Sequence, residues 1–149
     1  MKLLVIDPGE TVGYATFELV HCPSKLTLLQ AWEEPVPSIE EFTPTFLRLL
    51  WNEQPDLVVI EDYRVFQSKA GMHVGRRLFT PELIGAIVAL CSSVRPPITT
   101  ARVQPSKKGF WPDMRIKSRF PEAWGIAGHA KDAVKLGLAY LEGEKIWSP

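Results

Sequence analysis

Two acidic residues stand where buried strands are expected to end. Asp7 closes the apolar run 2–7, KLLVID, and Glu61 directly follows a second apolar run, 56–60, DLVVI. An acid at the point where a hydrophobic strand emerges is poorly explained as solvated surface. Two carboxylates held close together repel each other unless a cation lies between them. The pair therefore indicates a cation site, although Asp7 alone could instead cap the turn that follows it.

A third contribution to such a site comes from the C-terminal part of the chain. His129 and Asp132 are three residues apart, so on a helix they project from one face of its first turn. Either residue could also serve as an ordinary cap or dipole partner of a helix N-terminus. Taken with Asp7 and Glu61, the set is rich in oxygen and has one imidazole, which suits Mg²⁺ or Mn²⁺ better than zinc.

The elements that must position these residues follow from hydrophobic periodicity. The pattern predicts three meandering strands, a helix, a central strand, a helix, a strand and a final helix. Ser38 and Glu41 have capping-box spacing, with Pro44 expected in the first turn, and Pro81 is expected at the first position of the next helix. The order indicates an α/β fold with a five-stranded mixed sheet flanked by helices. The predicted strands are 2–7, 12–18, 25–32, 56–60 and 98–103, and the later helices are 81–94 and 129–142.

Charge is segregated along the chain although its net value is zero. Residues 1–63 carry 3 Lys or Arg against 11 Asp or Glu, whereas residues 64–119 carry 11 against 2. A basic block of this size is what a phosphate backbone would meet. The alternative is a solvated surface that balances the acidic half of the same domain.

The stretch 104–128 is basic and rich in proline, and it contains Trp111 and Trp124. Its composition predicts an irregular connection that becomes ordered on binding. The two tryptophans either stack on unpaired bases or tether this segment to the core, and the second interpretation is favoured.

Composition limits the class of protein. A chain of 149 residues that is 46% hydrophobic and 23% charged is typical of one globular domain, and we expect that domain to span residues 1–149. No apolar run reaches the roughly 20 residues of a membrane span. Cys22 and Cys91 have no metal-binding spacing, so a reduced, cytoplasmic protein is expected.

Three segments resemble the RuvC family of Holliday-junction resolvases, which have a ribonuclease H-like fold. VIDPGETVGYATF is similar to the first two strands of that family, DLVVIEDYRVF to its fourth strand, and HAKDAVKLGLAYL to its terminal helix. The order and spacing of the motifs agree over most of the chain. The IEDYRVF string, the FWPD segment and the H-x-x-D ending resemble phage-encoded members most, which would place the protein in the host cytoplasm.

The resemblance implies a catalytic site and a reaction. Asp7 would bridge two Mg²⁺ or Mn²⁺ ions, Glu61 would bind one of them, and His129 with Asp132 would hold the other. The family hydrolyses phosphodiesters by in-line attack of a metal-activated water. It also uses a lysine that follows the fifth strand, for which Lys107 is our choice among several basic residues.

The resemblance further implies a homodimer that makes paired symmetric nicks in a four-way junction, with 81–94 as the element shared between core and interface. The family wedges a phenylalanine into the junction three residues after the second acid. Arg64 stands at that position here, with the aromatic residues Tyr63 and Phe66 on either side, and Phe66 is our choice for the wedge. The residues expected to contact DNA are Arg64, Phe66, Lys69, Arg76, Arg77, Lys107, Lys108, Arg115 and Lys117.

Three alternatives compete with a junction resolvase. Actin-like kinases share the strand order, but they need a second lobe for which 149 residues leave no room, so no nucleotide cofactor is expected. A broader nuclease acting on flaps and forks would use the same ligands. A non-catalytic DNA-binding module would have no need for acids at all three positions.

Overall fold

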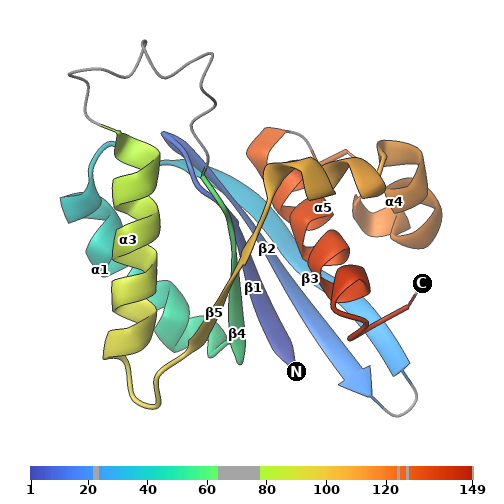
Figure 1. Ribbon diagram of the computed structural model, residues 1–149, viewed down its shortest axis with the longest axis horizontal. Coiled ribbons are helices and arrows are strands. Elements are labelled where there is room, and N and C mark those ends of the chain that lie inside the picture. The colour runs from blue at the N-terminus through green and yellow to red at the C-terminus, as the bar shows by residue number, and fades with distance from the viewer. Residues whose placement is uncertain (22–23, 64–77, 124, 127, 149) are drawn as a thin grey trace.

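The computed structural model describes residues 1–21, 24–63, 78–123, 125–126 and 128–148. Five strands form one sheet in the spatial order β3-β2-β1-β4-β5, and helices lie on both of its faces (Figure 1). The predicted α/β class with a five-stranded mixed sheet is therefore confirmed. Among the described residues, no helix is long and apolar enough to cross a membrane.

The strands agree with the predicted runs, but β2 and β3 are longer than expected. β1 (Lys2–Asp7), β2 (Thr11–His21) and β3 (Ser24–Pro35) form an antiparallel meander. β4 (Leu57–Glu61) is parallel to β1, and β5 (Thr99–Val103) is parallel to β4. Helices cover both faces of β1 and β4, so both strands are unbroken apolar runs rather than alternating ones.

Helices α1 (Ile39–Glu53) and α3 (Phe79–Ser93) cover one face of the sheet. The predicted cap of α1 is confirmed, because the Ser38 hydroxyl accepts a hydrogen bond from the Glu41 backbone N–H at 3.2 Å. The predicted position of Pro44 is wrong: it lies in the second turn, where it removes one helical hydrogen bond. Burial of Phe42, Phe46 and Leu50 holds the helix in spite of this loss. Pro81 is the third helical residue, not the first, which still leaves it in the first turn.

Helix α5 (Gly128–Gly143) packs on the opposite face, against β1 and β2. The contact is close at Gly137, where a Cβ would lie 2.7 Å from the ring of Phe17 and 2.8 Å from Val5. The two faces of the sheet thus carry two separate groups of buried apolar residues.

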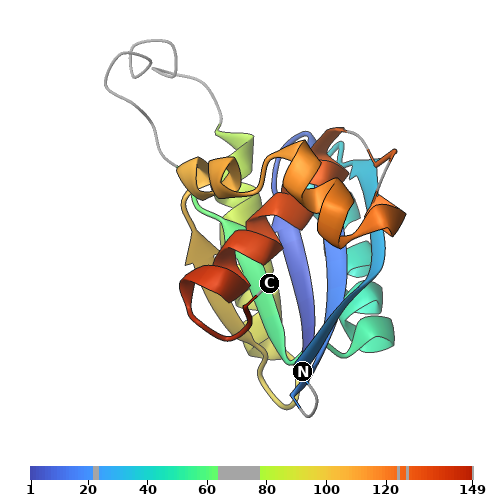
Figure 2. The same ribbon diagram turned by 90° about the vertical axis from the view of Figure 1, so that its right-hand side faces the viewer.

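The prediction of an irregular 104–128 segment is wrong for its described residues. They form η2 (Pro105–Phe110), α4 (Asp113–Arg119) and η3 (Pro121–Ala123), which pass over the end of the sheet beside α5 (Figure 2). Each of the three prolines stands at the start of a short helix, where its missing N–H removes no helical hydrogen bond.

Trp111 anchors this segment. Its side chain is fully buried beside Phe120 and Trp147, and its indole N–H donates to Glu142 at 2.9 Å. The interpretation of Trp111 as a tether to the core is confirmed, whereas Trp124 lies outside the described residues.

Candidate active site

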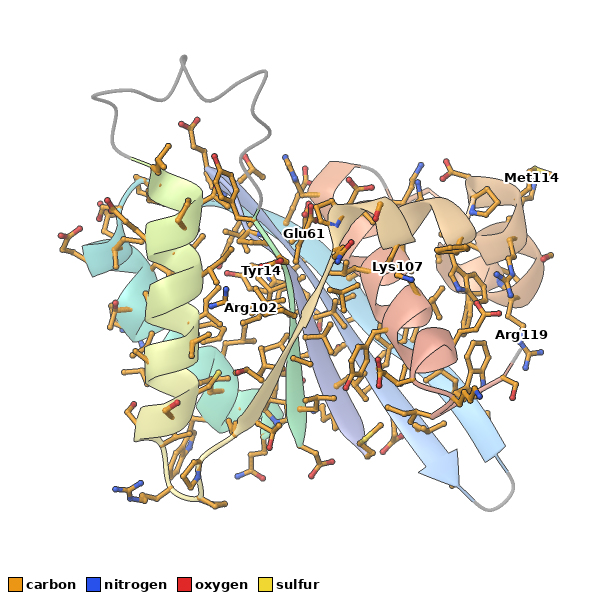
Figure 3. All side chains as sticks on the ribbon, viewed as in Figure 1. Tyr14, Glu61, Arg102, Lys107, Met114 and Arg119 are labelled. Carbon is orange, nitrogen blue, oxygen red and sulfur yellow. The ribbon has the colours of Figure 1, made fainter. Side chains whose placement is uncertain are left out.

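Asp7 and Glu61 meet at one edge of the sheet because their strands are parallel neighbours. Ile6 pairs with Ile60, so the residue that follows each of them emerges at the same level. The Asp7 side chain is only 7% exposed and that of Glu61 17%. Figure 3 shows Glu61 at the upper end of β4, the end of the sheet at which α5 begins.

The N-terminus of α5 is held against this edge by β2 and β3. Gly13 pairs with Asp7 in the sheet, and a Cβ at Gly13 would overlap the carbonyl group of His129. Glu33 pairs with Gly13 from the other side, and its carboxylate accepts the backbone N–H groups of His129 at 2.8 Å and Ala130 at 3.3 Å. A carboxylate is favourable at a helix N-terminus, where backbone N–H groups lack helical partners.

Lys108 and His129 complete a compact cluster. The Lys108 amino group lies 2.9 Å from Asp7 and 3.2 Å from Asp132, and it also contacts Glu61. The His129 Nδ1 lies 2.8 Å from the second oxygen of Asp7. Carboxylates from β1, β4 and α5 therefore converge on one ammonium group that comes from η2.

The cluster shifts the pKa of its members in opposite directions. Burial raises the pKa of Glu61 to about 8, and its hydrogen bond with Asp7 adds to this rise. Burial alone would raise the pKa of Asp7, but hydrogen bonds with Glu61, Lys108 and His129 bring it below its ordinary value. Burial alone would lower the pKa of Lys108, but the two carboxylates raise it to about 12. The crowding of two carboxyl groups thus moves their pKa values apart beside a charged lysine.

The side chains of the cluster are of the chemical types that bind a divalent cation. Glu61 Oε2 is buried, and the Lys108 amino group is paired with it. Carboxylate oxygens with one imidazole are suitable ligands for Mg²⁺ or Mn²⁺. The described residues include no group of three or more ligands arranged around a metal position. The carboxylates surround the Lys108 ammonium group.

The structure brings together Asp7, Glu61, His129 and Asp132, which are the four residues predicted to bind metal. It does not bring Lys107 to them: its amino group lies 5.2 Å from the centre of the Phe110 ring, and the neighbouring Lys108 occupies the cluster. The structure therefore places Lys108, and not the predicted Lys107, among the carboxylates.

Four of the nine predicted DNA contacts lie among the described residues: Lys107, Lys108, Arg115 and Lys117. Arg115 stacks on Trp111 at 3.9 Å and pairs with Glu142 at 2.7 Å, so it helps to hold α4 in place. Lys117 lies on the exposed surface of α4. The remaining five predicted contacts fall outside the described residues and stay predictions: Arg64, Phe66, Lys69, Arg76 and Arg77.

Replacing Gly13 by Ala is expected to displace the start of α5. The added Cβ would overlap the His129 carbonyl, so the helix must shift, at a cost of about 1–3 kcal/mol in the free energy of unfolding. Urea denaturation measures this loss, and Mn²⁺ titration should show weaker binding.

Gly85→Ala is the matched control, because nothing lies within 4 Å of a Cβ at that helical position. This variant should be as stable as the wild type or up to about 1 kcal/mol more stable, since alanine is favoured in helices. Equal stability of the Gly13→Ala protein and the wild type would contradict the close approach.

Comparison with solved structures shows what this arrangement resembles. T. thermophilus RuvC, solved with a Holliday-junction substrate, superposes with a TM-score of 0.73 over 98% of this chain and 96% of its own, at 14% identity. The fowlpox virus Holliday junction resolvase superposes with a TM-score of 0.68, over 97% of this chain and 99% of its own, also at 14% identity. The yeast mitochondrial Holliday junction resolvase superposes with a TM-score of 0.66, over 96% of this chain and 78% of its own, at 11% identity.

The sequence alone matches no family model and no curated protein. The structural comparison nevertheless shows that the chain shares its fold with RuvC and other Holliday-junction resolvases, at low sequence identity. The fold predicted from three short motifs is confirmed.

Proposed function

We propose that this protein is a metal-dependent endonuclease that resolves four-way DNA junctions by paired symmetric nicks. The observation that supports this most is the meeting of carboxylates from β1, β4 and α5 at one sheet edge, in a fold that known resolvases share. Two of the similar structures are described as complexes with Holliday-junction DNA.

Asp7, Glu61, His129 and Asp132 would hold two Mg²⁺ or Mn²⁺ ions. Bound in such a pair, the ions would activate a water molecule and stabilise both the attacking and the leaving oxygen of the phosphodiester. Within the protein, Asp7 fixes the orientation of the imidazole through its contact with His129 Nδ1. Glu33 and Gly13 fix the helix end that carries His129 and Asp132.

Lys108 supplies a positive charge at the position where the phosphate must arrive. Its pKa of about 12 keeps it protonated at neutral pH. A preorganised cation of this kind stabilises the negative charge that develops on a phosphate in the transition state. We further propose a homodimer, since paired nicks in opposed strands require two active sites. Sedimentation of the protein with and without a junction tests that assembly.

The experiment that tests the function is cleavage of matched labelled substrates with Mg²⁺ and with Mn²⁺. The substrates are a mobile four-way junction, a static junction, a flap, a fork, a duplex and an RNA–DNA hybrid. Symmetric nicks in the junctions alone are the expected result. Equal cutting of flaps and forks would make the protein a general debranching nuclease. Binding without any cutting would leave a DNA-binding module and reject the catalytic proposal.

A further inference from the structure

A second feature lies beside the acid cluster. An open groove of about 440 Å³ runs between β5, η2 and the C-terminal end of α5. This volume lies within the range of about 300–1,000 Å³ that is typical of small-ligand sites. The side chains that bear on its chemistry are Arg102, Gln104, Lys107, Phe110, Tyr140 and Glu144.

The groove presents an aromatic surface to solvent. Phe110 is 61% exposed, and the Lys107 amino group lies 5.2 Å from the centre of its ring. Stacking on an aromatic ring stabilises a nucleic-acid base by about 1–3 kcal/mol whatever the base, and nearby cations attract the phosphates. Arg102, whose side chain is 53% exposed, also lines the groove, and its guanidinium group lies 3.6 Å from the carboxylate of Asp62.

The opposite wall of the groove carries acidic side chains, one of which is paired within the protein. Glu142 is held by the guanidinium of Arg115 at 2.7 Å and by the indole N–H of Trp111 at 2.9 Å. Glu142 therefore has its charge balanced within the protein, and Glu144 is the second acid of the groove lining. Gln104 and Tyr140 offer neutral polar groups that can hydrogen-bond to the edge of a base.

The groove and the acid cluster share one turn of the chain. Lys107 lines the groove, whereas the next residue, Lys108, contacts Asp7, Glu61 and Asp132. Adjacent residues of one short helix thus place one lysine in the groove and the other in the acid cluster. Figure 3 shows Lys107 beside α5, at the same end of the sheet as Glu61.

We infer that this groove holds one unpaired nucleotide of the branched DNA, close to the phosphate that is cut, with its base stacked on Phe110. The inference rests on the proposed function, because it assigns a place for part of that substrate. A base in an intact duplex is stacked on both faces and cannot lie on Phe110. The groove therefore favours DNA whose bases are freed at a branch point, and it contributes to the selection of the cut position.

The test measures binding of a labelled four-way junction and of a matched duplex by fluorescence anisotropy, without divalent ions so that nothing is cleaved. Phe110→Ala should weaken junction binding about 5-fold to 150-fold and leave duplex binding unchanged. Phe110→Trp should retain junction binding. Met114→Ala is the control, because Met114 is 73% exposed on α4 outside the groove and should bind both DNAs as the wild type does.

A series of junctions with one abasic site each locates the nucleotide. At one position, within about two nucleotides of the cut, removal of the base should cancel the difference between wild type and Phe110→Ala. Junction binding by Phe110→Ala that equals the wild type, or a loss that is the same for every abasic junction, would overturn the inference. A wild-type protein that binds junction and duplex equally and cuts neither would reject the proposed function, and the bound nucleotide with it.

Discussion

Replacing Asp7 by Asn is expected to lower junction cleavage by at least about a thousandfold, which corresponds to about 4 kcal/mol of lost transition-state stabilisation. Asp7 is buried at the centre of the cluster, and its two oxygens contact Lys108 and His129. The amide keeps the shape of the side chain but loses the charge that a divalent cation requires. Single-turnover cleavage of a labelled junction with saturating Mn²⁺ measures the effect.

Junction binding by the same variant should be equal to that of the wild type or tighter. One negative charge that faces the phosphate is removed, while the positive charge of Lys108 remains. Asp56→Asn is the matched control, since Asp56 accepts the Lys2 backbone N–H at 2.7 Å beside the opposite end of β4. The control should cleave normally. Cleavage that survives in the Asp7→Asn protein would exclude Asp7 as a metal ligand.

The parts of the site that sequence could predict are those that follow from strand order. Asp7 and Glu61 were expected to meet because each ends an apolar run, and parallel neighbouring strands place their C-terminal ends at one sheet edge. The spacing of His129 and Asp132 predicted that both belong to the start of one helix, and α5 does carry both, although it begins at Gly128, so that Asp132 lies just beyond its first turn. The spacing of His129 and Asp132 and the Ser38 cap of α1 are short-range patterns, for which one sequence carries enough information.

The residues that sequence reasoning missed act across long separations. Glu33 holds the start of α5 from 96 residues away, and nothing in the local pattern of β3 marks it for that role. Gly13 lies in a strand, where an isolated glycine indicates the close approach of another backbone, and this was the one available clue.

The sequence also could not decide which of the neighbouring lysines, Lys107 or Lys108, lies in the cluster. In a 3₁₀ helix successive side chains are about 120° apart, so neighbouring lysines point in different directions. The phase of η2, which the sequence did not predict as a helix, decides which lysine enters the cluster.

Replacing Lys108 by Met is expected to separate metal binding from cleavage. The Lys108 ammonium group occupies the space between Asp7, Glu61 and Asp132, and a divalent cation must take over the same carboxylates. Removing the ammonium group relieves both the competition and the repulsion between like charges. Affinity for Mn²⁺ should therefore rise about 10-fold to 100-fold, since charges a few ångströms apart near a protein surface interact by several kcal/mol. Isothermal titration calorimetry of the DNA-free protein measures this rise.

Cleavage by the Lys108→Met protein should fall about 100-fold to 1,000-fold even when Mn²⁺ is saturating, because the fixed cation beside the phosphate is lost. Lys135→Met removes a lysine that pairs with Asp113 outside the cluster, and Lys131 also pairs with that acid. This control should change neither quantity. Unchanged Mn²⁺ affinity in Lys108→Met would mean that the ammonium group does not stand in the place of the metal. Tighter Mn²⁺ binding with full cleavage would instead limit Lys108 to neutralising the acids of the metal-free protein. A rise in affinity with a fall in rate is the combination that assigns both roles to one side chain.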